Sequence, residues 1–301
     1  MTLLEVKGLS KHYDKKPAVD DVSFQFREGG CITLIGPNGA GKTTILRTLA
    51  GLLKPTKGTV AFAGVEPNSD IRPFIGYLPQ HPVFYQWMTG EEFLTYSGML
   101  SNLSKTEATK QAKELLDVVG ISQVKSKRIG KYSGGMRQRL GIAQAMIHKP
   151  QLLMMDEPVS ALDPIGRREV LTLMEDLKKE LTILFSTHIL SDADEVSDEL
   201  LLLHQGRIVE SGSMEALREK YNTAKLELTF SENAGIYQEK IDALEEVSHS
   251  SVAGRTIRID ARNVALTRRN IIRTASEEDW PLTDFVTKHV TLEDMFMKVV
   301  N

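Results

Sequence analysis

The sequence is poor in cysteine and has no long hydrophobic run. Its single cysteine, Cys31, excludes an intrachain disulfide and a metal site built from several thiolates. Cys31 opens an apolar run, so we expect it to be a buried core thiol. No segment approaches the roughly 18 to 20 consecutive apolar residues that span a bilayer. The first residues reach Glu5 and Lys7 too early for the apolar stretch of a signal peptide, so we expect a cytoplasmic protein.

The sequence also has little net charge. Its 37 basic and 40 acidic residues leave a formal charge of −3, which gives no global electrostatic footprint for nucleic acid or anionic lipid. We therefore expect no nucleic-acid partner. The 41% of hydrophobic and 26% of charged residues are usual for a folded globular protein. Because a single core rarely grows past roughly 250 residues, the length of 301 predicts two domains.

Hydrophobic patterning predicts an α/β fold for the first part of the chain. Short apolar runs alternate with helical periodicity up to about residue 212, which is typical of a mainly parallel, buried sheet. The expected strands are Cys31–Ile35, Leu152–Met155, Thr182–Ser186 and Leu200–His204. Between about residues 85 and 146 helical signals replace the strands, beginning with a capping box at Thr89. We expect a helical insertion there.

The pattern changes again after about residue 220. Alternating runs predict strands at Leu226–Phe230, Thr256–Asp260 and Thr283–Val290, and helices are expected over 235–244, over 263–275 and from Leu292. We therefore expect a first domain over 1–220 and a small α/β domain over 221–301.

A glycine-rich segment between an expected strand and an expected helix has the spacing of a phosphate-binding loop. Its glycines let successive backbone N–H groups turn toward a phosphate, and the following helix adds its positive dipole end. Lys42 would reach the β- and γ-phosphates, and the Thr43 hydroxyl would bind Mg²⁺. The alternative is a glycine-rich turn that only happens to carry a lysine. The expected ATP-binding residues are Gly36, Pro37, Asn38, Gly39, Ala40, Gly41, Lys42, Thr43 and Thr44.

Two carboxylates end the next buried strand. Asp156 and Glu157 follow the run Leu152–Met155, and charges at such a place are costly without partners. Mg²⁺ and a polarised water would supply them, so we assign Asp156 to the metal and Glu157 to activating the attacking water as general base. The alternative is that both acids cap the turn at Pro158. His188 follows the strand Thr182–Ser186, where ligands of open α/β sheets bind, although a lone histidine is usually a satisfied surface or core residue.

A second Ser-Gly-Gly turn opens a helix at residues 132–139, whose sequence is YSGGMRQR. Together with the glycine-rich loop and the Asp-Glu strand, it resembles the signature of ATP-binding cassette (ABC) ATPases, usually Leu-Ser-Gly-Gly-Gln. An ordinary capped turn is the alternative. The resemblance implies a P-loop NTPase fold, ATP and Mg²⁺ as cofactors, and two ATPase subunits packed head to tail. Ser133, Gly134 and Gly135 would then face the γ-phosphate held by the partner. Tyr132 and Met136 depart from the usual signature, and we expect them to tune affinity.

Four further positions match this family one by one. Tyr13 resembles the aromatic residue that stacks on adenine, and Gln80, after the expected strand Ile75–Leu78, resembles the glutamine that senses Mg²⁺ and the membrane partner. Asp163 resembles a residue of the loop along the dimer seam, and His188 the histidine that holds the γ-phosphate. An exposed tyrosine, a loop glutamine, a helix cap and a solvated histidine are the alternatives.

The C-terminal part resembles the tail of bacterial exporters for drugs, bacitracin-like peptides or sodium, through residues 291–296, TLEDMF. The alternative there is a capped amphipathic helix. The resemblance implies an ATPase subunit of a membrane exporter, placed on the inner face of the membrane by an integral membrane subunit. A nutrient importer ATPase and a soluble ABC ATPase acting on ribosomes or DNA are the competing hypotheses. A regulatory nucleotide binder without catalysis is disfavoured by Glu157 and His188.

Overall fold

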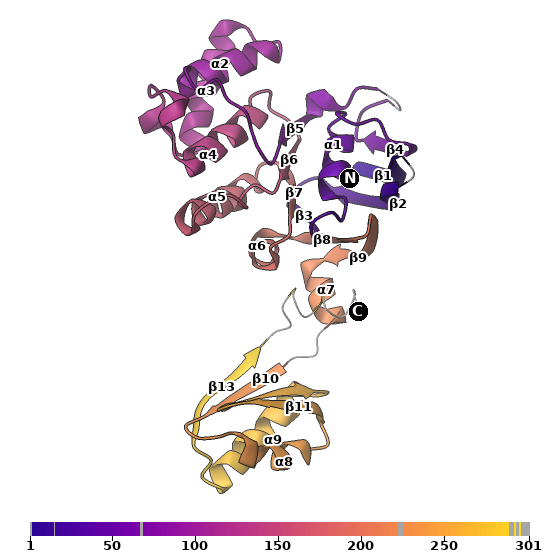
Figure 1. Ribbon diagram of the computed structural model, residues 1–301, viewed down its shortest axis with the longest axis vertical. Coiled ribbons are helices and arrows are strands. Elements are labelled where there is room, and N and C mark those ends of the chain that lie inside the picture. Colours follow the sequence, from indigo (N-terminus) through magenta and orange to yellow (C-terminus); the bar gives the residue numbers. More distant parts are fainter. Residues whose placement is uncertain are drawn as a thin grey trace. The chain divides into compact units, whose positions relative to one another are not determined.

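The computed structural model describes residues 2–14, 16–66, 69–221 and 225–288, together with Leu292 and Met295. The chain forms two compact units, Met1–Met214 and Glu215–Asn301 (Figure 1). Within the described residues, no helix combines the length and the apolar character needed to cross a bilayer.

A six-stranded sheet forms the centre of the first unit. Its strand order is β5-β6-β7-β3-β8-β9, and every neighbouring pair is parallel except β8 and β9. The strands are β3 (Cys31–Ile35), β5 (Ile75–Leu78), β6 (Leu152–Asp156), β7 (Thr182–Thr187), β8 (Glu199–His204) and β9 (Arg207–Ser213). The strands expected in β3, β5, β6, β7 and β8 are confirmed. Cys31 is fully buried, and burial raises the pKa of its thiol.

An antiparallel sheet of order β2-β1-β4 lies beside this central sheet (Figure 1). It contains β1 (Thr2–Tyr13), β2 (Lys16–Arg27) and β4 (Lys57–Phe62). These strands were not predicted. The β1–β2 pairing shifts register at four places, and such bulges interrupt the alternation of apolar and polar residues by which a strand is recognised.

Helices flank the central sheet. The first unit contains α1 (Lys42–Leu49), α2 (Gly90–Leu100), α3 (Lys105–Val118), α4 (Gly134–Ala145), α5 (Pro164–Leu177) and α6 (Leu190–Val196), and three short turns of 3₁₀ helix, Arg72–Phe74, Ser122–Val124 and Ile129–Lys131. Helices α2, α3 and α4 confirm the helical insertion, and Thr89 forms the expected capping box with Glu92. Ser104 forms a second capping box, with Glu107, at the start of α3.

Tyr132, one of the two residues that differ from the usual signature, lies in the core of the insertion. Its side chain is 4% exposed, and its hydroxyl donates a hydrogen bond to the carbonyl oxygen of Val124 at 2.9 Å. Tyr132 therefore contributes to packing inside the insertion, whereas Ser133 begins the adjoining helix.

Helix α7 (Met214–Lys220) starts at the last residue of the first unit. The second unit contains an antiparallel sheet of order β11-β12-β10-β13, packed on one face by α8 and α9 (Figure 1). Phe230 stacks on Tyr237 with ring centroids 4.4 Å apart, and Trp280 completes this aromatic core. The elements are β10 (Lys225–Phe230), α8 (Gly235–Asp242), β11 (Val247–Ala253), β12 (Thr256–Ala261), α9 (Val264–Glu277) and β13 (Leu282–Lys288). Helix α7 and strand β11 were not predicted.

The expected closing helix falls mostly outside the described residues. Leu292 and Met295 are described, and both are helical and buried. Residues 289 and 290 of the expected last strand also lie outside the described part of the chain.

Candidate functional site

The glycine-rich segment links β3 to α1, as expected, and forms one wall of a cavity of about 540 Å³. Helix α1 begins at Lys42, so its free N–H groups face this cavity. Residues from four further places in the sequence complete the walls. The lining residues are Ala18, Asn38, Gly39, Ala40, Gly41, Lys42, Thr43, Thr44, Gln80, Glu157, Ser160 and His188.

Lys42 is 5% exposed and points into this cavity. Its Nζ donates hydrogen bonds to the carbonyl oxygens of Gly36 at 2.7 Å and Pro37 at 3.2 Å. Burial lowers the pKa of Lys42, whereas the carboxylates of Glu157 and Asp156 oppose this shift. A buried ammonium group at a helix N-terminus is a suitable partner for phosphate oxygens.

Asp156 lies at the end of β6 and is fully buried. Its Oδ1 accepts hydrogen bonds from the hydroxyls of Thr43 at 3.1 Å and Ser186 at 2.7 Å. Its Oδ2 is buried without a hydrogen-bond partner among the described residues. An unpaired, buried carboxylate oxygen is costly unless a cation or a water satisfies it. The chemistry of Thr43 and Asp156 therefore fits a hard cation such as Mg²⁺.

Glu157 projects into the cavity from a backbone with φ of 48°, an uncommon conformation for a residue other than glycine. Its Oε1 lies 3.6 Å from Lys42 Nζ and accepts a hydrogen bond from His188 Nδ1 at 3.1 Å. Its Oε2 accepts a hydrogen bond from Gln80 Nε2 at 3.1 Å. Glu157 thus joins three residues that were predicted from separate parts of the sequence.

Tyr13 does not line this cavity. It ends β1, its side chain is 49% exposed, and the ammonium group of Lys11 lies 5.5 Å from its ring centroid. Its stacking on adenine stays a prediction.

The expected signature residues lie away from the cavity, where α4 and α5 begin. The hydroxyl of Ser133 caps α4 by accepting a hydrogen bond from Met136 N at 3.2 Å. Asp163 caps α5 in the same way, through Gly166 N at 3.2 Å. None of Ser133, Gly134, Gly135 and Asp163 lines the cavity of their own chain. Apart from Tyr13, the structure therefore separates the predicted site residues into two groups. The cavity group lines the cavity or bonds to its wall, and the helix-start group comprises Ser133, Gly134, Gly135 and Asp163.

Sequence reasoning missed two side chains of the cavity region. Ser186 donates to Asp156, and its hydroxyl also accepts a hydrogen bond from Glu157 N at 3.0 Å. Ser160 also lines the cavity, and it was not among the residues predicted from the sequence. The signal for Ser186 was its place at the end of an expected strand, but the sequence does not reveal that β6 and β7 are neighbours.

Because Gly41 is closely packed, replacing it with alanine should strongly reduce the stability of the protein. Gly41 has φ of 107°, and an added Cβ would lie 2.4 Å from the carbonyl oxygen of Ala18. We expect Gly41→Ala to lose about 1 kcal/mol of unfolding free energy from the backbone conformation and about 1–3 kcal/mol more from the overlap. Urea denaturation would measure the loss, and titration with nucleotide should show weakened binding.

Gly29→Ala is the matched control. Gly29 also has a positive φ, of 88°, but an added Cβ would meet nothing within 4 Å. Equal losses of stability in both variants would contradict the close approach of Gly41 to Ala18.

Comparison with known proteins identifies two families along the chain. Residues 19–160 match the family model described as "ABC transporter". Residues 212–300 match the model described as "ATP-binding protein DrrA1-3-like, C-terminal domain".

Individual relatives cover most or all of the chain. The ABC transporter ATP-binding protein YxlF of Bacillus subtilis is 42% identical, over 99% of this chain and 100% of the relative. The bacitracin transport ATP-binding protein BcrA of Bacillus licheniformis is 36% identical, over 77% of this chain and 76% of the relative. A dimeric ATP-binding cassette, MJ0796, solved with ADP and Pi, is 25% identical with a TM-score of 0.63, covering 70% of this chain and 99% of that one. The chain therefore belongs to the ABC transporter family as an ATP-binding, ATP-hydrolysing subunit.

Proposed function

We propose that the cavity group binds Mg-ATP and hydrolyses it. The convergence on one cavity of the glycine-rich loop, Lys42 and Glu157, with Asp156 bonded to Thr43 in its wall, carries this proposal. Lys42 and the backbone N–H groups of residues 38–44 would hold the phosphates, and Tyr13 the adenine. Thr43 and Asp156 would hold the magnesium ion, with Gln80 nearby. The metal would neutralise charge on the phosphate oxygens.

We assign to Glu157 the role of general base. Its carboxylate would accept a proton from a water whose oxygen bonds to the γ-phosphorus, while the bond to the β-phosphate oxygen breaks and ADP leaves. Phosphate oxygens would compete with Glu157 for Lys42, which lies only 3.6 Å from the carboxylate. Nucleotide binding would therefore release Glu157 from one partner, and His188, still within hydrogen-bond distance, would orient it and contact the γ-phosphate.

We propose that two copies form the active unit, each completing the other's site. The helix-start group, Ser133, Gly134, Gly135 and Asp163, lines no part of its own chain's cavity. It lies at the N-terminal ends of α4 and α5, whose dipoles favour a second anion. The dimeric state of the related MJ0796 supports this arrangement.

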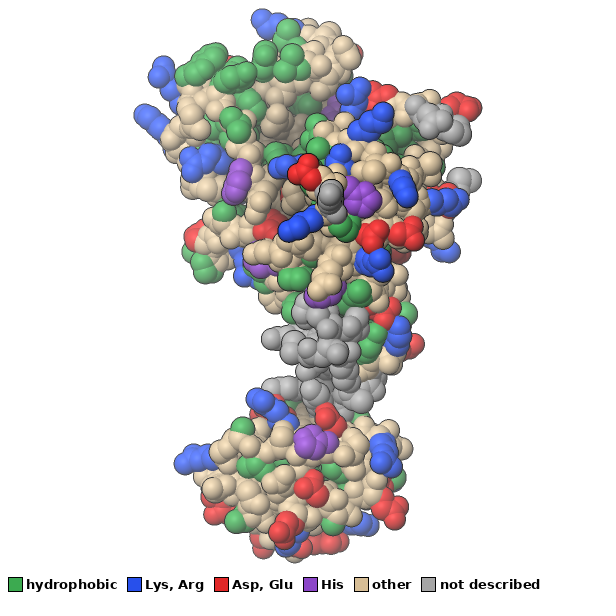
Figure 2. Space-filling view, turned by 45° about the vertical axis from the view of Figure 1, so that its right-hand side comes forward, with side chains coloured by type: hydrophobic (Ala, Val, Ile, Leu, Met, Phe, Trp, Pro, Cys, Tyr) green, Lys and Arg blue, Asp and Glu red, His purple; other side chains and the backbone are tan. Residues whose placement is uncertain are grey.

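An apolar patch on the insertion is the proposed docking surface for an integral membrane subunit. Figure 2 shows hydrophobic side chains gathered over the insertion. The patch comprises Val83 (87% exposed), Tyr85 (49%), Trp87 (68%), Tyr96 (39%), Met99 (48%) and Leu100 (68%). The ring of Tyr85 lies 6.0 Å from those of both Trp87 and Tyr96, and exposed apolar side chains gathered in this way mark interaction sites. The segment from Gln80, which contacts Glu157, runs directly into this patch and would couple docking to hydrolysis.

The transporter is proposed to be an exporter, with the chain in the cytoplasm at the inner face of the membrane. The bacitracin transport relative supports a role in transport, and the resemblance of residues 291–296 to the tail of bacterial exporters favours this direction. We propose an ATPase domain over 1–220, with its insertion over about 85–146, and a C-terminal domain over 221–301. A nutrient importer ATPase is the second candidate.

Co-purification from membranes tests the proposed function. We expect the tagged chain, extracted in mild detergent, to bring down one integral membrane protein. Recovery of a ribosomal or nucleic-acid partner, or a hydrolysis rate stimulated by nucleic acid, would contradict the proposal.

Trp87→Ser should reduce the recovery of the membrane subunit about tenfold or more, because exposed tryptophans at interface centres typically contribute 2 kcal/mol or more to binding. Quantitative immunoblotting of the membrane subunit that is recovered with the tagged chain would measure the change. Ile236→Ser is the matched control, since Ile236 is equally exposed (66%) but lies on α8. An equal effect of both substitutions would exclude the patch as the docking surface.

A further inference from the structure

Helices α4 and α5, which carry the helix-start group, begin side by side. A Cβ added to Gly135 on α4 would lie 3.6 Å from the Cα of Gly166 on α5. A Cβ added to Gly134 would lie 3.7 Å from the side chain of Leu162, just before α5. The first turns of the two helices are therefore in direct contact, with Ser133 and Asp163 at their starts.

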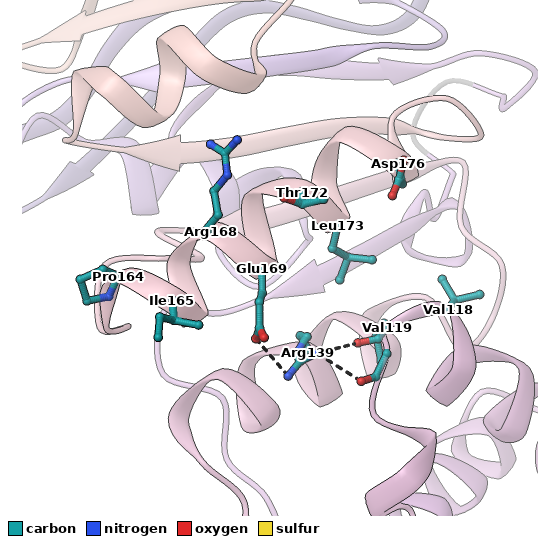
Figure 3. Close-up of a pocket in the computed structure, with 11 residues that line it drawn as sticks. Val118, Val119, Arg139, Pro164, Ile165, Arg168, Glu169, Thr172, Leu173 and Asp176 are labelled. Carbon is teal, nitrogen blue, oxygen red and sulfur yellow. Dashed lines mark hydrogen bonds and ion pairs between the residues drawn. The ribbon is translucent and has the colours of Figure 1, made fainter.

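About one turn further along, Arg139 of α4 joins α5 to the end of α3 (Figure 3). Its Nη2 lies 3.2 Å from Glu169 Oε2 on α5. Its Nη1 donates to the carbonyl oxygen of Gly120 at 3.2 Å and lies 3.5 Å from that of Val119. These carbonyls follow the C-terminal end of α3, where a cation is favourable.

A groove of about 600 Å³ opens beside this link, between the end of α3 and the outer face of α5 (Figure 3). Val118 and Ile165 line it and remain 51% and 72% exposed. Apolar packing that leaves such a space does not by itself fix the separation of α3 and α5. The guanidinium contacts of Arg139 bridge that space.

We propose that the Arg139–Glu169 pair is a positioning link, which holds Ser133 and Asp163 in one fixed arrangement so that both meet the partner's nucleotide together. This inference rests on the proposed two-chain site. Neither Arg139 nor Glu169 lines the nucleotide cavity, so the pair does not contact the reacting atoms. It acts by holding α4 and α5 in place. Its side chains are 15% and 47% exposed, and a partly exposed ion pair contributes little to folding, so its loss should leave the fold intact.

Mixed dimers of differently tagged chains test this link. One chain carries Glu157→Gln, so that hydrolysis occurs only in the cavity of the other chain, which the first chain completes. Glu169→Ala on the Glu157→Gln chain should lower kcat about tenfold with little change in the KM for ATP, since misplaced positioning groups cost up to about 10² in rate. The same substitution on the chain with the active cavity should have little effect.

Glu175→Ala is the matched control on the same helix, because Glu175 pairs at 3.1 Å with Lys178, the residue directly after α5, and not with a residue of α4 in the described part of the chain. It should match the parent in both arrangements. Glu169→Gln, which retains an oxygen acceptor for Arg139, should keep most of the activity, and it replaces the alanine variant if thermal melting shows that variant to be unfolded.

Ser133→Ala, placed on each chain in turn, distinguishes a failure of the positioning link from a failure of the two-chain site. If it lowers kcat only from the Glu157→Gln chain while Glu169→Ala has equal effects or none from both chains, the positioning link is wrong and the two-chain site stands. If Ser133→Ala shows no dependence on which chain carries it, the two-chain site is wrong and the link falls with it.

Discussion

Glu157→Gln is expected to bind ATP and to hydrolyse it about 10² to 10⁴ times more slowly than the parent chain. The glutamine side chain has the same length and can still accept a hydrogen bond from Gln80 or His188, so the cavity keeps its shape. It cannot take a proton from water, and it removes the charge that lies 3.6 Å from Lys42 Nζ. Phosphate release at saturating ATP, together with equilibrium binding of a fluorescent nucleotide, separates the two effects.

The control for this substitution is Glu180→Gln, which changes an exposed carboxylate beyond α5 and should leave hydrolysis as it is. The hydrolysis-deficient chain should also accumulate as a dimer when saturated with Mg-ATP, which light scattering would show. Hydrolysis by Glu157→Gln at close to the parent rate would overturn the general-base assignment. A chain that stays monomeric with bound Mg-ATP would overturn the two-chain site.

Lys42→Ala should act one step earlier and weaken nucleotide binding about 10- to 100-fold. Hydrogen bonds to charged groups contribute roughly 1.5–3 kcal/mol, and each 1.4 kcal/mol changes an affinity tenfold. The substitution also removes the hydrogen bonds from Nζ to the carbonyl oxygens of Gly36 and Pro37, so the empty loop loses internal order. Calorimetric titration with a non-hydrolysable ATP analogue would measure the affinity.

Lys110→Ala provides the comparison, since Lys110 is 78% exposed on α3 and remote from the cavity lining. Its nucleotide affinity should equal that of the parent. An unchanged affinity in Lys42→Ala would mean that the loop does not bind phosphate through this ammonium group.

Local sequence patterns predicted much of the fold. The buried strands β3, β6 and β7 are continuous apolar runs because both faces of the parallel sheet are covered. The capping box at Thr89 needs only residues three apart, so the sequence also marked the start of α2 correctly. Strands β1 and β2 escaped prediction because their register shifts break the alternating pattern.

The surroundings of the candidate site were less predictable. Ser186 was missed because its bond to Asp156 depends on β6 and β7 being neighbours in register, with Asp156 opposite Ser186. Tyr132 was considered only as a change in the signature, whereas its ring fills the core of the insertion and its hydroxyl reaches Val124. Asp163 caps α5 in this chain, and that contact is compatible with a place at a dimer seam.

The sequence by itself determined the glycine-rich loop, the acids that end β6, and the Ser-Gly-Gly helix start, because each depends on residues a few positions apart. The tertiary structure alone decided that Lys42, Gln80 and His188 all meet the carboxylate of Glu157. It also decided that Arg139 joins three helices. Such contacts depend on strand order and helix packing across distant parts of the chain, and no local pattern of side chains encodes them.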